Sequence, residues 1–120
     1  MSRLTVLVLV AFLLAGCQRA PQKPTFGTPY QAVLLDNGQL LFGKLADTGP
    51  VGYSTLIDVF YVQTQTNRET GNVTSVLIRR GQESHRPGIM YISTRHIVLV
   101  ESVAPDSPIA TLIAQNQPAK

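Results

Sequence analysis

Hydrophobic residues form one nearly continuous run near the start of the chain, and further along they alternate with polar residues. This apolar run covers residues 4–14; it follows Met1-Ser2-Arg3 and leads into small residues before Cys17. Its eleven residues are too few to cross a bilayer, which needs about 20. A basic start, a short apolar stretch and small residues before a cut site are typical of a secretory signal peptide.

From residue 30 onward, β-branched and aromatic residues occur in short runs separated by turn-forming residues. These runs predict strands over residues 30–35, 39–46, 53–65, 73–80 and 89–103. Asn37-Gly38 predicts a β-hairpin with a type I′ turn, in which both central residues have positive φ. Gly43 predicts a bend or bulge inside the second run. The last run is much longer than a typical strand of about 5–6 residues, so we expect a bend near residues 93–95.

The spacing of hydrophobic residues becomes helical near the C-terminus. Ser107 and Pro108 are typical of the N-cap and first position of a helix. Ile109, Leu112 and Ile113 would share one face of that helix, which must dock on the sheet because a short helix is marginal alone. The expected fold is mainly β, a small five-stranded barrel with a short C-terminal helix. This domain would cover residues 30–116, and residues 117–120 would be a disordered tail.

Composition supports a small exported domain. Residues 17–29 are polar and contain several prolines, which predicts a flexible linker. Cys17 is the only cysteine, so the fold must rely on apolar burial without disulfides. Ten Lys and Arg face seven Asp and Glu, and removal of Arg3 with a signal peptide would leave nine. This small excess does not favour nucleic acid as a partner.

The segment Leu14-Ala15-Gly16-Cys17 resembles the lipobox of bacterial lipoproteins. The resemblance implies that residues 1–16 are a cleaved signal peptide and that Cys17 carries lipid, such as palmitate. The mature protein would then be anchored to a membrane rather than span it. In the Gram-negative sorting rule for this class, Asp after the cysteine causes retention in the inner membrane. Gln18 stands there, which implies the outer membrane of the cell envelope, with the domain facing the periplasm.

Residues 34–45, LLDNGQLLFGKL, resemble the opening hairpin of Sm-like and other SH3-like small barrels, and residues 56–59, LIDV, resemble the start of their next strand. The hairpin is also similar to that of short, uncharacterised bacterial proteins. These similarities imply an architecture only. Sm proteins bind RNA through loops after their second and fourth strands, and no matching Asn or Arg set occurs here. We therefore expect no nucleic-acid partner.

Candidate catalytic and metal-binding residues are sparse. Ser84-His85 and the pair Ser93 and His96 bring serine near histidine, but no G-x-S-x-G turn is present. The two histidines lack the spacing and further ligands of a metal site. We expect His85 to be a solvated loop residue and His96 a partly buried strand residue. The sequence therefore predicts no catalytic residues, no metal and no cofactor, and the protein is not expected to be an enzyme.

The most concentrated functional candidates are Arg79, Arg80, Arg86 and Arg95, which fall within seventeen positions. If the last two predicted strands pair, these side chains would gather at one rim and could bind an envelope protein or anionic lipid. Alternatively, they are solvated charges that protect an edge strand. The expected function is a lipid-anchored, non-enzymatic binding or scaffolding module of the envelope. A structural accessory subunit of a larger secretion or pilus complex is the alternative.

Overall fold

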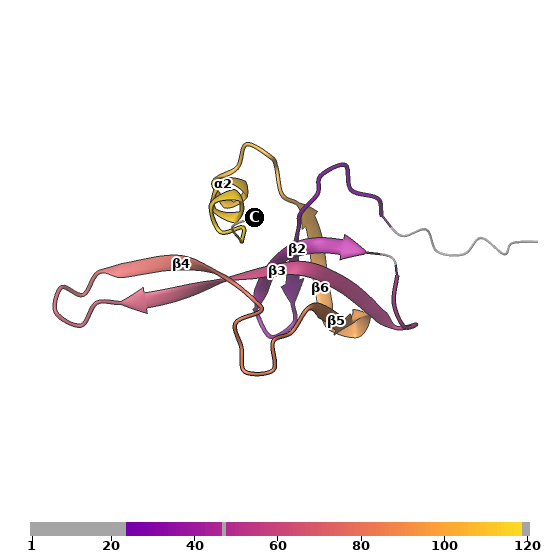
Figure 1. Ribbon diagram of the computed structural model, residues 1–120, viewed down its shortest axis with the longest axis horizontal. Coiled ribbons are helices and arrows are strands. Elements are labelled where there is room, and N and C mark those ends of the chain that lie inside the picture. Colours follow the sequence, from indigo (N-terminus) through magenta and orange to yellow (C-terminus); the bar gives the residue numbers. More distant parts are fainter. Residues whose placement is uncertain (1–23, 47, 119–120) are drawn as a thin grey trace, which may run out of the picture.

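A computed structural model describes residues 24–46 and 48–118 of the chain (Figure 1). The predicted signal peptide, Cys17 and the first part of the linker lie outside these residues. No helix within the described ranges is long and apolar enough to cross a membrane.

Within the described residues, six antiparallel strands form one sheet, and a single α-helix follows them. The strands are β1 (Gln31–Leu35), β2 (Leu40–Ala46), β3 (Tyr53–Thr66), β4 (Val73–Arg79), β5 (Ile89–Ser93) and β6 (Ile97–Ser102). A 3-10 helix, η1 (Thr94–His96), separates β5 from β6, and α2 (Pro108–Gln115) lies near the C-terminus. The order in the sheet is β4-β3-β2-β1-β6, with β5 also paired to β3.

The predicted mainly β fold with a short C-terminal helix is confirmed, but a closed five-stranded barrel is not. The strand pairings form an open path that ends at β4 and β6. The strand count differs because the last predicted run contains η1, at the position where the sequence predicts a bend. The 3-10 turn divides that run into two strands, of which β5 pairs with β3 and β6 with β1.

The first hairpin is confirmed, but its turn differs from the predicted type. Gly38 has a φ of 83° and donates its N–H to the carbonyl of Leu35 at 3.0 Å. Asn37 does not have positive φ. The loop is therefore a three-residue connection, a type I turn followed by a left-handed glycine. Asp36 supplies the extra residue, which a two-residue type I′ turn does not have.

Both faces of the central strands are buried, which explains their nearly continuous apolar sequences. Neighbouring residues point to opposite faces of a sheet. One hydrophobic cluster comprises Ala32, Phe42, Phe60, Leu77, Val103 and Ile113, and the other comprises Val33, Leu41, Leu56, Val59 and Ile92. Helix α2 covers the first cluster through Ile113 (Figure 1). The curved sheet encloses the second, to which strands β1, β2, β3 and β5 all contribute.

The end of the chain bears out the predicted helix start. Ser107 accepts a hydrogen bond from the backbone N–H of Ala110 at 3.2 Å, and Pro108 occupies the first turn. Ile113 is buried and Ile109 packs beside it, whereas Leu112 stays partly exposed. The helix is therefore held by two of its three predicted apolar contacts.

The described part of the predicted linker, residues 24–29, forms no strand or helix but lies against the sheet. The buried Gln31 side chain donates from Nε2 to the carbonyl of Thr28 at 2.6 Å. Its Oε1 accepts from the N–H of Leu45 at 2.9 Å. These bonds satisfy a buried amide and fasten the start of the domain to β2.

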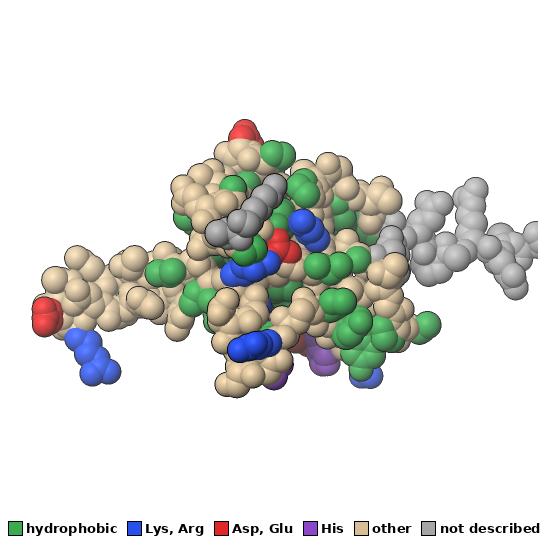
Figure 2. Space-filling view, viewed as in Figure 1, with side chains coloured by type: hydrophobic (Ala, Val, Ile, Leu, Met, Phe, Trp, Pro, Cys, Tyr) green, Lys and Arg blue, Asp and Glu red, His purple; other side chains and the backbone are tan. Residues whose placement is uncertain are grey.

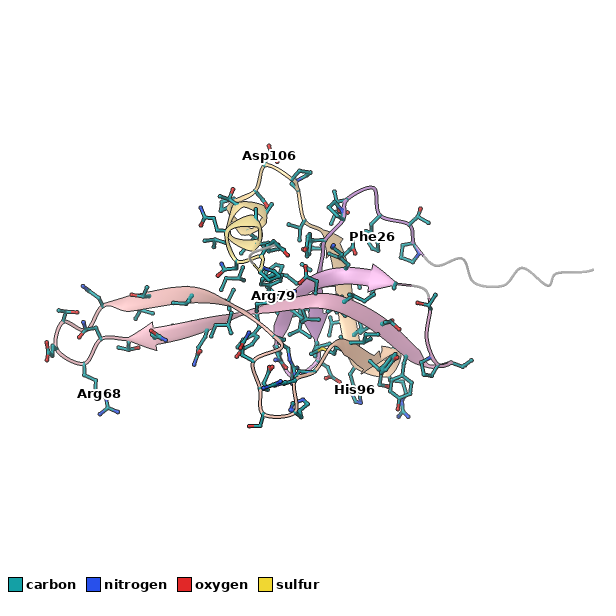
Figure 3. The ribbon with its side chains drawn as sticks, viewed as in Figure 1. Phe26, Arg68, Arg79, His96 and Asp106 are labelled. Atoms are coloured by element: carbon teal, nitrogen blue, oxygen red, sulfur yellow. The ribbon has the colours of Figure 1, made fainter. Side chains whose placement is uncertain are left out.

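Strands β3 and β4 continue beyond the rest of the sheet as a two-stranded projection, residues 62–76, which we call the arm (Figure 1). Every residue of the arm is exposed. The turn at its tip is closed by Asn67, whose backbone N–H donates to Asn72 at 2.8 Å and whose carbonyl accepts from Gly71. Arg68 lies at the tip, far from Phe26 near the start of the described chain (Figure 3). We call the remaining described residues the body.

Candidate functional site

A cleft of about 570 Å³ opens where β3 changes partners. Strand β5 pairs with the first half of β3 and β4 with the second half, so the two follow one another along the same edge. At the change, Asp58 has a φ of 54°, and the β2–β3 register shifts opposite Gly43. This bulge is the irregularity that Gly43 predicts in the sequence. A Cβ at Gly43 would lie 2.7 Å from Leu56 Cγ, so only glycine fits without movement.

The cleft has a charged side and an apolar side. Arg79, Arg80 and His85 line it from the end of β4 and the following loop, and Asp58 lines it from β3. The apolar lining comes from both strands and the loop: Ile57, Val59, Pro87, Ile89, Met90 and Tyr91. Two arginines therefore face one aspartate, and the lining carries a net positive charge. Ligand sites commonly combine apolar walls with a few polar groups in this way.

Asp58 is the centre of a hydrogen-bond network beside the cleft. Its Oδ1 accepts from Arg79 Nε at 2.9 Å and lies 2.8 Å from Arg79 Nη2. Its Oδ2 accepts from the hydroxyl of Tyr30 and from Gln117 Nε2, the latter at 3.3 Å. Gln117 also donates to the Tyr30 hydroxyl at 3.0 Å. Figure 3 shows Arg79 at the root of the arm. The network thus joins the sheet to the residues after the helix.

The network shifts the titration of both acidic groups in it. Burial raises the pKa of the Tyr30 hydroxyl to about 12, and the Asp58 carboxylate adds to that rise. Burial would also raise the pKa of Asp58, but hydrogen bonds from Tyr30 and Arg79 outweigh it and hold that pKa below its ordinary value. Asp58 is therefore ionised at neutral pH, and its charge keeps the Arg79 guanidinium in place.

The loop over the cleft is held by its own polar contacts. Glu83 Oε2 accepts from the backbone N–H of Gly81 at 2.8 Å, and this bond is the main cause of a lowered Glu83 pKa. Arg80 Nε is 3.0 Å from Glu83 Oε1. Glu83 therefore covers the Nε side of the Arg80 guanidinium, and the Arg80 side chain as a whole stays 27% exposed.

Only part of the predicted basic set comes together. Arg79 and Arg80 line the cleft, whereas Arg86 and Arg95 are not among its lining residues. Arg86 is an exposed loop residue with a φ of 44°, and Arg95 is exposed in η1. The residues from 89 onward return along β3 before reaching η1, which carries Arg95 past the cleft.

The two histidines are also in different places. His85 is exposed in the loop, as the sequence predicts, and it lines the cleft. The prediction for His96 is wrong: it lies in η1, its side chain is 60% exposed, and Nδ1 is 2.7 Å from Asp36 Oδ2. The bend that divides the last predicted strand lifts His96 off the sheet. Within the described ranges, no group of three His, Cys, Asp or Glu residues could hold a metal.

Sequence reasoning missed the pairing of Asp58 with Tyr30 and Gln117. One signal was available: Asp58 is the only charged residue in the fourteen-residue strand β3. A carboxylate in such a run needs a partner, because burying an unpaired charge is costly. The partners come from the start and the end of the domain, so local spacing could not identify them.

Comparison of the sequence with models of protein families and with curated proteins found no match.

Proposed function

We propose that the protein is a lipid-anchored, non-enzymatic binding module of the bacterial envelope, and that the cleft takes an anionic group attached to an apolar moiety. The observation that carries this proposal is the pairing of a cationic side with an apolar wall in one cleft. Arg80 lines the cleft with a side chain that is 27% exposed, so a ligand oxygen would accept from its guanidinium. His85, exposed beside it, adds a second polar contact at the rim.

An apolar wall supports a ligand with a hydrophobic part rather than a bare ion. Ile89 and Tyr91 line the cleft and are each about half exposed. Covering such side chains contributes roughly 25 cal/mol per Å² of apolar area. The arginines supply orientation: Arg79 is already held by Asp58, so the guanidinium geometry is set before a ligand arrives.

Photo-cross-linking in intact cells tests the cleft. The full chain carries a photo-reactive benzoylphenylalanine in place of Tyr91, which lines the cleft, or in place of Tyr53, which does not. Both tyrosines are about half exposed, so they form a matched pair. We expect a discrete adduct from position 91 and not from position 53.

The dependence of that adduct on the arginine charge distinguishes binding in the cleft from non-specific binding elsewhere on the surface. Arg80→Ser should abolish the adduct from position 91, whereas Arg95→Ser, outside the cleft lining, should leave it unchanged. Identical adducts from positions 53 and 91, or an adduct that survives Arg80→Ser, would rule out the cleft as the binding site.

The anchor rests on the lipobox resemblance and has its own test. Metabolic labelling with an alkyne-tagged palmitate should mark the wild-type chain, and Cys17→Ser should lose the label because the thiol accepts the lipid. Label retained by Cys17→Ser would contradict the lipoprotein assignment.

A further inference from the structure

The arm lacks the features that normally protect an exposed sheet edge. Neither strand segment of the arm, residues 62–66 or 73–76, contains a charged residue or a proline. Its charges, Arg68 and Glu69, belong to the turn at the tip. On the face visible in Figure 2, the charged side chains of the arm gather at its tip. Protected edges usually carry Lys, Pro or bulges, and uncharged β-rich edges pair readily with other strands.

Strand β4 has an open edge along its whole length, because it is the last strand in the sheet order. The backbone N–H of Arg80 donates to Val59, so these two residues form a hydrogen-bonded pair. Such pairs alternate along an antiparallel ladder. Val73, Ser75 and Leu77 therefore direct their backbone N–H and C=O groups away from β3, toward the open edge.

We propose that the β4 edge pairs antiparallel with β4 of a second copy of this chain, centred on Ser75. This register would join the two copies through about six backbone hydrogen bonds from the outward-facing residues. It sets Val73 of each copy beside Leu77 of the other. Val73 is 64% exposed, and Leu77 belongs to the hydrophobic cluster under α2. Pairing thus extends an existing core over the most exposed apolar side chain of the arm.

The charges favour a second copy as the occupant. In the antiparallel register, the tip of each arm reaches the level at which β4 of the other copy enters the body. Arg68 and Glu69 at the tip would then both lie near the Arg80–Glu83 ion pair of the second copy, so each end of the interface is balanced in charge, and this contact occurs twice by symmetry. The uncharged strands between these ends set no like charges opposite one another. The interface is self-complementary, as a two-fold dimer requires.

Cysteine cross-linking of the full chain tests this register. Ser75→Cys places two thiols across the proposed two-fold axis, where opposed residues lie about 5.5 Å apart, within the range of a disulfide. Thr64→Cys is the matched control, because Thr64 lies directly opposite Ser75 but on β3. Under mild oxidation we expect a covalent dimer from Ser75→Cys and background from Thr64→Cys. The wild type, which has only Cys17, defines that background.

Two further measurements keep the proposal falsifiable if cysteine disturbs the arm. Light scattering of the detergent-solubilised chain should give a dimer for the wild type and a monomer for Ser75→Pro, which removes an outward N–H without breaking the β3–β4 ladder. The exchange of the Ser75 amide should slow as protein concentration rises. A monomeric wild type, a dimer that survives Ser75→Pro, or equal cross-linking from positions 64 and 75 would overturn the proposed interface.

Discussion

The body and the arm share strands β3 and β4 but bury their side chains very differently. In the body, adjacent residues Val59 and Phe60 both lie in hydrophobic clusters, one on each face of the sheet. In the arm, residues 62–76 of the same two strands are exposed on both faces. A two-stranded ribbon is at best marginally stable in water. The arm therefore depends on the body for its position, and the body should not depend on the arm.

The largest loss of stability should come from replacing Phe60, which is fully buried at the junction of sheet and helix. Phe60→Ala removes contacts with both neighbouring strands and α2, and should lower the free energy of unfolding by about 3–5 kcal/mol. Val62→Ala, two residues along the same strand but in the arm, is the matched control. Chemical denaturation of both variants measures the difference, and equal losses would mean that the arm is part of the folding core.

The next largest loss of stability should come from replacing Gly43, because a side chain there should distort the bulge beside the cleft. In Gly43→Ala the new Cβ would meet the buried Leu56 side chain and come within 3.0 Å of the Ile57 carbonyl. Relief requires movement of β3, so we expect a loss of about 1–3 kcal/mol. Gly27→Ala, where the added Cβ meets nothing within 4 Å, serves as the control for a glycine in open space. A melting temperature equal to the wild type would show that β3 can shift freely.

Asp58→Asn tests whether the network supports the body through charge. The side chain of Asp58 is 11% exposed but that of Arg79 is 36% exposed, so solvent weakens their pairing. We expect a loss of about 1–2 kcal/mol at neutral pH. Because folding lowers the pKa of Asp58, its contribution is complete above the ordinary value of 3.8 and is lost as pH falls through the lower folded value.

The advantage of wild type over Asp58→Asn should therefore shrink as pH is lowered below about 4. Thermal melts of both proteins between neutral and acid pH measure it. A difference that stays constant down to strongly acid pH would mean that the carboxylate charge contributes nothing.

The sequence predicts those features of the body and the arm that depend on residues close together in the chain. The strand positions, the helix start at Ser107 and the bulge at Gly43 follow from residues close in the chain. The exposure of the arm does not, because Thr, Gln and Val alternate in the same way in half-buried and in unsupported strands. The cleft is equally non-local: Asp58 and Arg79 are 21 positions apart and meet only through the β3–β4 register.

Gly38→Val should cost less than the core changes and tests the first turn of the body. Gly38 has a φ of 83° with open space around it, so the penalty is conformational rather than steric crowding by neighbours. A β-branched residue there should cost about 1–2 kcal/mol. Gly71→Val makes the same change at a φ of 71° in the turn of the arm. If the arm is independent of the body, only Gly38→Val should lower the main unfolding transition.

The smallest effect on stability should come from Val73→Ala, and it gives the sharpest separation of the two regions. Val73 is the most exposed hydrophobic residue of the arm, so truncation in a single copy should change the free energy of unfolding by no more than about 0.5 kcal/mol. In the proposed dimer, however, the same side chain lies beside Leu77 of the second copy. Denaturation at low protein concentration should therefore match the wild type, while light scattering at high concentration should show weaker dimerisation. A variant that loses stability at low concentration would mean that Val73 already packs within one copy, and the distinction between body and arm would fail at that residue.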